Sequence, residues 1–275
     1  THVAVGDLDG DARPEIVAML RWSKIVVLEH TGEVKWTLSG PSGGSYGGPS
    51  IANVDGEGLP EIIVGAWVLN ADGTFHSSQR RNAGRGLVSV ADLDLDGTLE
   101  IVGGNQAWRH DGTVFFSTGG YDGFPAIGNF DTDLFPEIVV AKGGRIYLYE
   151  HDGTEKWSLE HPGSGFGGPP TVADFDGDGA VEVGVAGSHQ YAVVDTDGRL
   201  LWTSPTVDTS SHITSSAVFD FEGDGSAEVV YNDHFYLRVY RGRDGAVLAE
   251  IKNPSCTLTE NPVIADVDAD GNAEI

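Results

Sequence analysis

Residues 172–187 read VADFDGDGAVEVGVAG, and they place the carboxylates of Asp174, Asp176, Asp178 and Glu182 within nine residues. Carboxylates this close repel one another unless a cation compensates them. Alternate acids closed by a glutamate form a cage of oxygen atoms, which suits Ca²⁺ with its roughly six to eight oxygen ligands. Short β-branched runs flank the acidic segment and predict strands on both sides of it. We therefore expect a calcium loop that joins two strands.

The acidic pattern occurs seven times, at intervals of 46, 39, 37, 45, 46 and 46 residues. Each copy follows [D/N]-x-[D/E]-x-[D/E]-x-x-x-E, so the copies predict several bound calcium ions, up to seven. The expected metal ligands are Asp7, Asp9, Asp11 and Glu15; Asn53, Asp55, Glu57 and Glu61; Asp92, Asp94, Asp96 and Glu100; Asn129, Asp131, Asp133 and Glu137; Asp174, Asp176, Asp178 and Glu182; Asp220, Glu222, Asp224 and Glu228; and Asp266, Asp268, Asp270 and Glu274.

The spacing and composition of these loops exclude two other kinds of metal site. An EF-hand has its closing glutamate at position 12, whereas every copy here has it at position 9. Zinc is not expected, because no His or Cys lies within the loops. Glycine at position 4 or 6 allows a tight backbone path in most copies, but the fourth copy has Leu134 where glycine is common, which predicts a distorted turn.

A second turn follows the acidic loop in six repeats, as in HTGEVKW at 30–36 and TDGRLLW at 196–202. Such turns between apolar runs predict hairpins, so each repeat is expected to contain four strands, A to D. Four strands per repeat of roughly 40–45 residues are typical of a β-propeller blade. We predict an all-β fold in which 1–275 is a single β-propeller domain. Blades start near 2, 48, 87, 124, 169, 215 and 261, and the seventh is incomplete.

The loops and their flanking strands resemble FG-GAP/VCBS repeats, the units of the integrin α-subunit N-terminal propeller and of many bacterial secreted proteins. SYGGPSIANVDGEG at 45–58 and GFGGPPTVADFDGDG at 165–179 also keep aromatic-Gly and Gly-Pro elements ahead of the acidic loop. The resemblance implies Ca²⁺ bound between the first two strands of a blade. It implies a fold and a metal but not an activity.

The net charge of −26 arises in the acidic loops, which contain 26 of the 42 Asp and Glu residues. The remaining 16 acids balance the 16 Lys and Arg residues, and no basic stripe suggests a nucleic-acid partner. No apolar run is long enough for membrane insertion. The chain begins at Thr1 without Met, which favours a mature or excised piece of a secreted, extracellular or cell-surface protein. An incomplete seventh blade would leave an exposed strand edge through which chains can associate.

The connections between strand D of one blade and strand A of the next are the expected ligand face. Arginine forks suit carboxylates and sulfates, and aromatic rings can form a rim there. The candidate ligand-binding residues are Tyr46, Arg80, Arg81, Arg85, Tyr121, Phe166 and His212. A solvated loop or packing over the channel mouth explains these residues equally.

Three functions remain open on the sequence. The first is a calcium-stabilised extracellular binding or adhesion module for a protein or glycan ligand. The second is a carbohydrate-active propeller enzyme similar to rhamnogalacturonan lyases, although no catalytic acid–base constellation is evident. The third is a structural surface spacer that binds no ligand.

Overall fold

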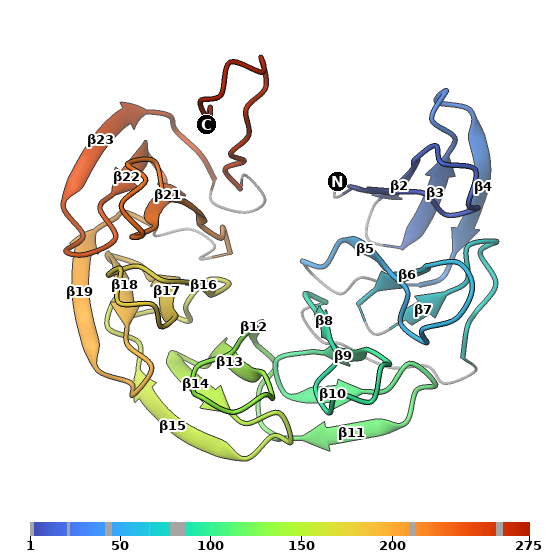
Figure 1. Ribbon diagram of the computed structural model, residues 1–275, viewed down its shortest axis with the longest axis horizontal. Helices are drawn as coiled ribbons and strands as arrows, with labels where there is room; N and C mark the ends of the chain where they lie inside the picture. The colour runs from blue at the N-terminus through green and yellow to red at the C-terminus, as the bar shows by residue number, and fades with distance from the viewer. Residues whose placement is uncertain are drawn as a thin grey trace. The chain divides into compact units, whose positions relative to one another are not determined.

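The computed structural model describes residues 3–20, 23–41, 46–65, 67–77, 86–208, 213–256 and 261–275. The 23 strands in this part of the chain form six antiparallel sheets (Figure 1). Contacts divide the chain into two compact units, Thr1–Pro125 with His151–Gly153, and Ala126–Glu150 with Thr154–Ile275. Among the described residues, no helix is long and apolar enough to cross a membrane. The expected all-β fold is confirmed.

The first unit contains three sheets whose strands follow one another in chain order. The first sheet comprises β1 (Val3–Gly6), β2 (Glu15–Leu20), β3 (Lys24–Leu28) and β4 (Val34–Ser39). The second comprises β5 (Pro49–Ala52), β6 (Glu61–Val64) and β7 (Trp67–Leu69). The third comprises β8 (Ser89–Ala91), β9 (Glu100–Val102), β10 (Gln106–Trp108) and β11 (Val114–Ser117).

The remaining three sheets repeat the same order of four strands, and nearly all their residues belong to the second unit. The fourth sheet comprises β12 (Phe124–Gly128), β13 (Glu137–Lys142), β14 (Arg145–Tyr149) and β15 (Glu155–Glu160). The fifth comprises β16 (Thr171–Ala173), β17 (Glu182–Ala186), β18 (Gln190–Val194) and β19 (Leu200–Pro205). The sixth comprises β20 (Ala217–Phe219), β21 (Glu228–Asn232), β22 (Tyr236–Tyr240) and β23 (Val247–Lys252).

Each acidic loop closes the hairpin between the first two strands of its sheet. The residue before the loop pairs with the closing glutamate, as Gly6 does with Glu15 and Ala173 with Glu182. The residue at loop position 2 is apolar and buried in the first five repeats, which anchors the loop in the core. These anchors are Leu8, Val54, Leu93, Phe130 and Phe175. One short sequence therefore sets both the hairpin and its attachment to the core.

Aromatic residues in the fourth strands link successive repeats. The Nε1–H of Trp36 donates to the carbonyl of Ala71 at 3.0 Å, and that of Trp157 donates to the carbonyl of Thr196 at 2.7 Å. The ring of Trp36 lies against Gly73 in the next turn, where a Cβ would approach the ring to 3.1 Å and where φ is +83°. Glycine in these turns therefore serves both the backbone conformation and the packing between repeats. Trp36 and Trp157 therefore pack against the next repeat within their own units.

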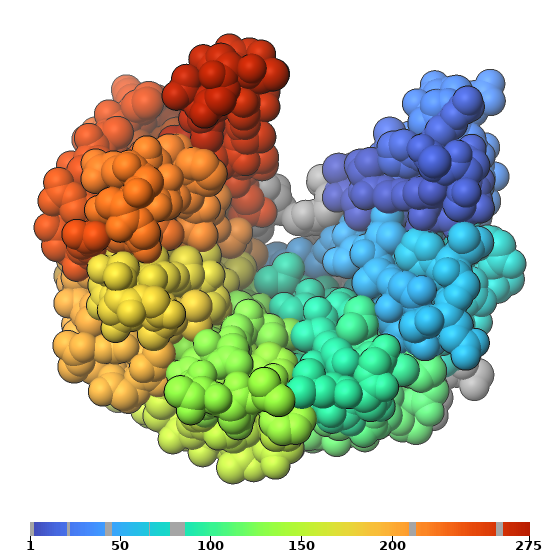
Figure 2. Space-filling model, in the orientation of Figure 1, coloured from blue at the N-terminus to red at the C-terminus, as the bar shows by residue number. Residues whose placement is uncertain are grey.

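Two repeats differ from the expected four strands. In the second repeat, the strand after the Asp-Gly turn is reduced to one bridge between Leu69 and Phe75, so this sheet has three strands. The polar sequence FHSS that begins at Phe75 lacks the β-branched run of a strand. In the seventh repeat, residues 261–275 contain only a bridge between Ala265 and Glu274, and most of them are exposed (Figure 2, dark red).

Candidate metal centre

The acidic loop of repeat 5, which we call loop 5 (residues 174–182), is organised by its own backbone. Asp174 accepts hydrogen bonds from the N–H groups of Gly177 at 2.6 Å and Gly179 at 2.9 Å. Asp176 Oδ1 accepts a hydrogen bond from the N–H of Asp178, and Asp178 Oδ1 accepts one from the N–H of Ala180. These contacts are Asx-type turns, which Asp forms readily. They fix the carboxylates around one point.

The closing glutamate is the most constrained of these side chains. Glu182 is fully buried, and its Oε2 accepts a hydrogen bond from the N–H of Phe175 at 2.7 Å. Its other oxygen, Oε1, is buried without a hydrogen-bond partner, as are Oε1 of Glu15, Glu100 and Glu137. A buried carboxylate oxygen without a partner is costly. A divalent cation among the neighbouring carboxylates would satisfy it, so the residues present fit a metal ion.

The side chains of five loops approach closely enough to share one ion. In each group below, one ligand atom per residue lies within 4.8 Å of all the others. The groups are Asp7, Asp9 and Glu15; Asp55, Glu61 and His76; Asp92, Asp94 and Asp96; Asp131, Asp133, Glu137 and Glu150; and Asp174, Asp176, Asp178 and Glu182. Calcium–oxygen distances of about 2.3–2.6 Å place two ligands up to roughly 5 Å apart. The carboxylate-rich groups therefore have the dimensions of a calcium site.

The structure adds residues to these groups and leaves others outside them. Glu150 and His76, which lie outside the acidic loops, join the groups of loops 4 and 2, whereas only loop residues were expected from the sequence. Asn129 is engaged within its loop, because its Nδ2 donates to the carbonyl of Asp133 and its Oδ1 accepts from the N–H of Asp131. Asn53 Oδ1 is buried and has no hydrogen-bond partner, so it remains available as a ligand.

The backbone of loop 4 (residues 129–137) differs from that of the other loops. In the other six loops, positions 4 and 6 both have positive φ, even where they are Ala12, Leu95 or Ala269. In loop 4 these positions are Thr132 and Leu134, and neither has positive φ. The distorted turn expected from Leu134 is therefore observed. A β-branched threonine and a leucine avoid the left-handed conformation, and the loop follows another path.

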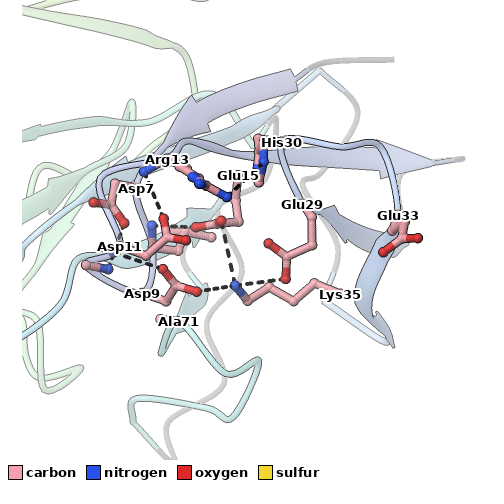
Figure 3. Close-up of polar contacts among 12 residues, drawn as sticks. Asp7, Asp9, Asp11, Arg13, Glu15, Glu29, His30, Glu33, Lys35 and Ala71 are labelled. Carbon is pink, nitrogen blue, oxygen red and sulfur yellow. Dashed lines mark hydrogen bonds and ion pairs between the residues drawn. The ribbon is translucent and has the colours of Figure 1, made fainter.

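Basic side chains reach four of the loops, loops 1, 3, 4 and 6, which was not expected from the sequence. In loop 6 (residues 220–228), Arg243 lies 3.2 Å from Asp224. In loop 1 (residues 7–15), Lys35 Nζ lies 2.6 Å from Asp9, 3.2 Å from Glu29 and 3.6 Å from the buried Oε1 of Glu15 (Figure 3). The Lys35 ammonium is therefore the neighbour of the oxygen that otherwise lacks a partner, and it lies where it can neutralise the loop.

Loops 3 and 4 have equivalent ion pairs. Lys156 lies 2.6 Å from Asp131, 2.9 Å from Glu150 and 3.9 Å from Glu137 Oε1. In loop 3 (residues 92–100), Arg109 lies 3.0 Å from Asp94 and 3.5 Å from Glu100 Oε1. For loop 5, the described residues show no ion pair between its four carboxylates and a cation.

A β-bulge delivers these lysines. In five sheets, the pairing of the third and fourth strands shifts register by one residue beside the Asp-Gly turn, so one residue of the fourth strand has no partner. Bulges re-aim a side chain in this way. The unpaired residues are Lys35, Phe115, Lys156, Leu201 and Leu248. In the sequence, this residue comes just before the tryptophan that recurs in the fourth strands, as in VKW and EKW. The repeat pattern alone did not assign it a contact with the acidic loop.

The pKa values of several loop side chains depend on burial and on these contacts. Burial raises the pKa of Glu182 to about 7. The hydrogen bond from the N–H of Phe175 opposes this shift, and the nearby carboxylate of Asp176 adds to it. Burial likewise raises the pKa of Glu100 to about 7, although Arg109 opposes the shift. In loop 1, the hydrogen bond from Lys35 lowers the pKa of Asp9, and the same bond raises the pKa of Lys35. Burial therefore raises the pKa of the closing glutamate in loop 5, where no cation pairs with it, and also in loop 3, where Arg109 only opposes the shift.

The residues expected on the ligand face are only partly described. Arg80, Arg81, Arg85 and His212 lie outside the described residues. Tyr46 is half-buried and packs on Phe124 with ring centroids 6.2 Å apart, whereas Tyr121 and Phe166 are 82% and 60% exposed. A pocket of about 540 Å³ lies instead beside the acidic loops, between Leu8, Lys35, Leu59 and Asn70 of repeats 1 and 2.

Comparison with known proteins agrees with this geometry. A family model for the FG-GAP-like repeat matches residues 129–185 and 174–231. Residues 129–231 therefore resemble FG-GAP-like repeats. The matched segments contain loops 4, 5 and 6, so the acidic loops are the recurring feature of the FG-GAP-like units in this chain. No curated protein sequence matches the chain.

Several solved structures resemble this chain in fold. The V. cholerae biofilm matrix protein Bap1 has a TM-score of 0.85 at 18% identity, over 99% of this chain and 72% of Bap1. The exotype rhamnogalacturonan lyase YesX has a TM-score of 0.66 at 20% identity, over 96% of this chain and 57% of the lyase. An Agrocybe aegerita lectin that recognises terminal N-acetylglucosamine has a TM-score of 0.50 at 16% identity, over 92% of this chain and 81% of the lectin. These similarities in fold indicate that the sheets of this chain resemble the blades of a β-propeller.

Proposed function

We propose that this chain is an extracellular binding or adhesion module whose FG-GAP-like loops are stabilised by Ca²⁺. The observation that carries the proposal is the buried Oε1 of the closing glutamate, which has no hydrogen-bond partner in four repeats and no ion-paired cation in loop 5. The carboxylates around it form an oxygen-only set, which favours Ca²⁺ over Zn²⁺ in the loops without histidine. When bound, the ion would supply the positive charge that loop 5 lacks. The full set of ligands named from the sequence is part of this proposal.

The fold that we propose for this function is one β-propeller domain over residues 1–275, with the seven repeats as its blades. Five repeats form four-stranded sheets of the expected type and the second forms a three-stranded sheet, and tryptophans link neighbouring sheets within each unit. The regular spacing of the acidic loops supports a common place for each in its blade. Radial repetition of this kind leaves only short strand edges, which suits a secreted surface protein.

The proposed ligand is a protein or a glycan at a cell surface or in a matrix. Bap1 is a biofilm matrix protein, and the Agrocybe aegerita lectin recognises a sugar, so both neighbours in fold support this class of partner. Exposed aromatic rings such as Tyr121 and Phe166 suit stacking against sugars or aromatic side chains. A glycan array with the calcium-loaded chain tests the proposal. Binding to a defined glycan that is lost in Tyr121→Ala or Phe166→Ala supports it, and absence of glycan and protein ligands favours a spacer.

A second candidate function is cleavage of an acidic polysaccharide, because the fold also resembles the lyase YesX. The chain spans 57% of that lyase, so activity is a separate proposal from fold. Assay of the chain on rhamnogalacturonan, with release of unsaturated products followed by absorbance, distinguishes the two candidates. Product release at catalytic ratios would replace the adhesion proposal.

A further inference from the structure

Repeat 2 brings nitrogen ligands to an acidic loop. His76 occupies the place in its repeat that Lys35 and Lys156 occupy in theirs, and its ring faces loop 2 (residues 53–61). Ligand atoms of His76, Asp55 and Glu61 all lie within 4.8 Å of one another. His110 enters from the turn of repeat 3, with its Nδ1 3.4 Å from His76 Nε2. No zinc site was expected from the sequence because no histidine lies within a loop, but the tertiary structure brings His76 to loop 2 from outside it.

The hydrogen bond between His76 Nδ1 and Asn70 fixes Nδ1 as a protonated nitrogen, whereas Nε2 lies within hydrogen-bond distance of His110. Asn70 Nδ2 donates to Thr74 Oγ1 at 2.9 Å, so Asn70 Oδ1 must accept at 3.0 Å from His76 Nδ1–H. The proton on Nδ1 leaves the lone pair on Nε2, the atom that faces Asp55 and His110. Metal-binding histidines are oriented in this way by a partner on the other nitrogen. The His76 side chain is only 15% exposed, so its orientation is constrained by packing as well.

The spacing of the two imidazoles suits one small ion. Two nitrogens bound to a tetrahedral Zn²⁺ at about 2.0–2.1 Å are separated by about 3.3–3.4 Å. His76 Nε2 and His110 Nδ1 are separated by 3.4 Å, and Asp55 Oδ2 lies 3.9 Å from His76 Nε2. A neutral imidazole does not neutralise Asp55 and Glu61 as a lysine does in repeats 1 and 4. A divalent cation would satisfy both charges and both nitrogens.

We propose that His76, His110, Asp55 and Glu61 form a site for a divalent transition metal of the Zn²⁺ class. Imidazole with carboxylate selects such metals, whereas Ca²⁺ takes oxygen ligands. The site joins repeats 2 and 3 beside the sheet whose fourth strand is reduced to a single bridge. It takes Asp55 and Glu61 from the calcium ligands proposed for loop 2, and it is independent of the other loops and of the proposed adhesion function.

The test uses Co²⁺ as a spectroscopic probe for the Zn²⁺ class, added to the full chain in saturating Ca²⁺ so that oxygen-only loops are filled. We expect one Co²⁺ per chain with visible ligand-field absorption, and displacement of Co²⁺ by Zn²⁺. His76→Gln and His110→Gln should each weaken Co²⁺ binding at least ten-fold. Asn70→Ala should weaken it about ten-fold through loss of ring orientation.

His30→Gln is the matched control, because His30 occupies in repeat 1 the turn position that His110 occupies in repeat 3. It should leave Co²⁺ binding unchanged. His76→Lys places at this position the residue found in repeats 1 and 4, and it should abolish the Co²⁺ absorption while the melting temperature in Ca²⁺ is retained. Co²⁺ absorption that is equal in His76→Gln, His76→Lys and the unmodified chain would overturn the proposal. A weakening in His30→Gln equal to that in His110→Gln would also overturn it.

Discussion

Loop 1 and loop 5 share one sequence pattern, but only loop 1 holds an ion-paired cation. In both, the first Asp accepts two backbone hydrogen bonds, and the closing Glu buries an oxygen that no hydrogen bond satisfies. In loop 1 the ammonium of Lys35 lies 3.6 Å from that oxygen, whereas repeat 5 has Leu201 at the same bulge position. A built-in cation thus supports loop 1, and loop 5 depends on an added one. Equal motifs need not have equal metal affinity.

Removal of Ca²⁺ is expected to have the largest effect and to affect loop 5 more than loop 1. With a Kd of roughly 10⁻⁴ M, 1 mM Ca²⁺ stabilises by about 1.4 kcal/mol per loop, and by an amount of order 10 kcal/mol over seven loops. EGTA should lower the melting temperature strongly, and β17 should lose hydrogen-exchange protection before β2. A melting temperature insensitive to EGTA would reject calcium stabilisation, and simultaneous loss in β2 and β17 would reject the difference between the loops.

Exchange of the residues at the bulge position should reverse the difference in Ca²⁺ affinity between loops 1 and 5. Lys35→Leu is expected to raise the Ca²⁺ affinity of loop 1 by about ten-fold, because a competing charge near the site is removed, and to lower the melting temperature in EGTA. Leu201→Lys should lower the affinity of loop 5 by a similar factor and raise its hydrogen-exchange protection in EGTA, since a lysine stem can keep apolar contact. Calcium titration followed by calorimetry measures both.

Melting in saturating Ca²⁺ is the control for the packing that either exchange disturbs. If both variants bind Ca²⁺ as the unmodified chain does, the basic residues have no influence on the sites, and the comparison between loops 1 and 5 loses its basis.

The pH dependence of the free energy of unfolding should identify loop 5, which has no ion-paired cation and whose closing glutamate has a raised pKa. The pKa of Glu182 rises from an ordinary value of 4.5 to about 7 on folding. A carboxyl whose pKa is raised on folding contributes stability that is fully present below pH 4.5 and is lost as the pH rises through 7. Without metal, stability should therefore fall between about pH 5 and 8, and the gain from Ca²⁺ should grow over the same range.

Thermal unfolding with and without EGTA at several pH values checks this expectation. Glu182→Gln keeps the shape of the side chain but has no titrating group, so it should flatten the metal-free profile. Glu15→Gln is the matched variant in loop 1, where Lys35 already compensates the loop. A profile equally altered by both variants would contradict the assignment to loop 5.

The smallest expected effect concerns the backbone of loop 1. Ala12 has φ of 66°, at the position where loop 5 has Gly179. The left-handed conformation costs an alanine roughly 1 kcal/mol, and glycine relieves this while it adds entropy to the unfolded chain. Ala12→Gly should raise the stability in Ca²⁺ by about 0.5 kcal/mol, measured by urea unfolding. Ala180→Gly, in loop 5 at a position without positive φ, is the control and should not stabilise.

The sequence by itself predicted what is local to each repeat. The acidic loop, its glycines and the hairpin that it closes lie within about a dozen residues, where side chain to backbone hydrogen bonds and strand propensity decide the conformation. Leu134 in loop 4 predicted a different backbone for the same reason, because positive φ is unfavourable for a residue other than glycine, although Leu95 in loop 3 adopts it. The tryptophan packing followed from one repeated position.

The tertiary structure alone decided which charges and ligands surround each loop. Lys35 meets Asp9 across 26 residues, and His76 meets His110 across 34, because a bulge and the contact between repeats bring them together. In repeat 2, the polar sequence after Phe75 reduces the fourth strand to a bridge, and the spacing of turns did not reveal this. A repeated motif encodes the shape of its own loop. Its electrostatics depend on residues from other strands, because charge acts through space and not along the chain.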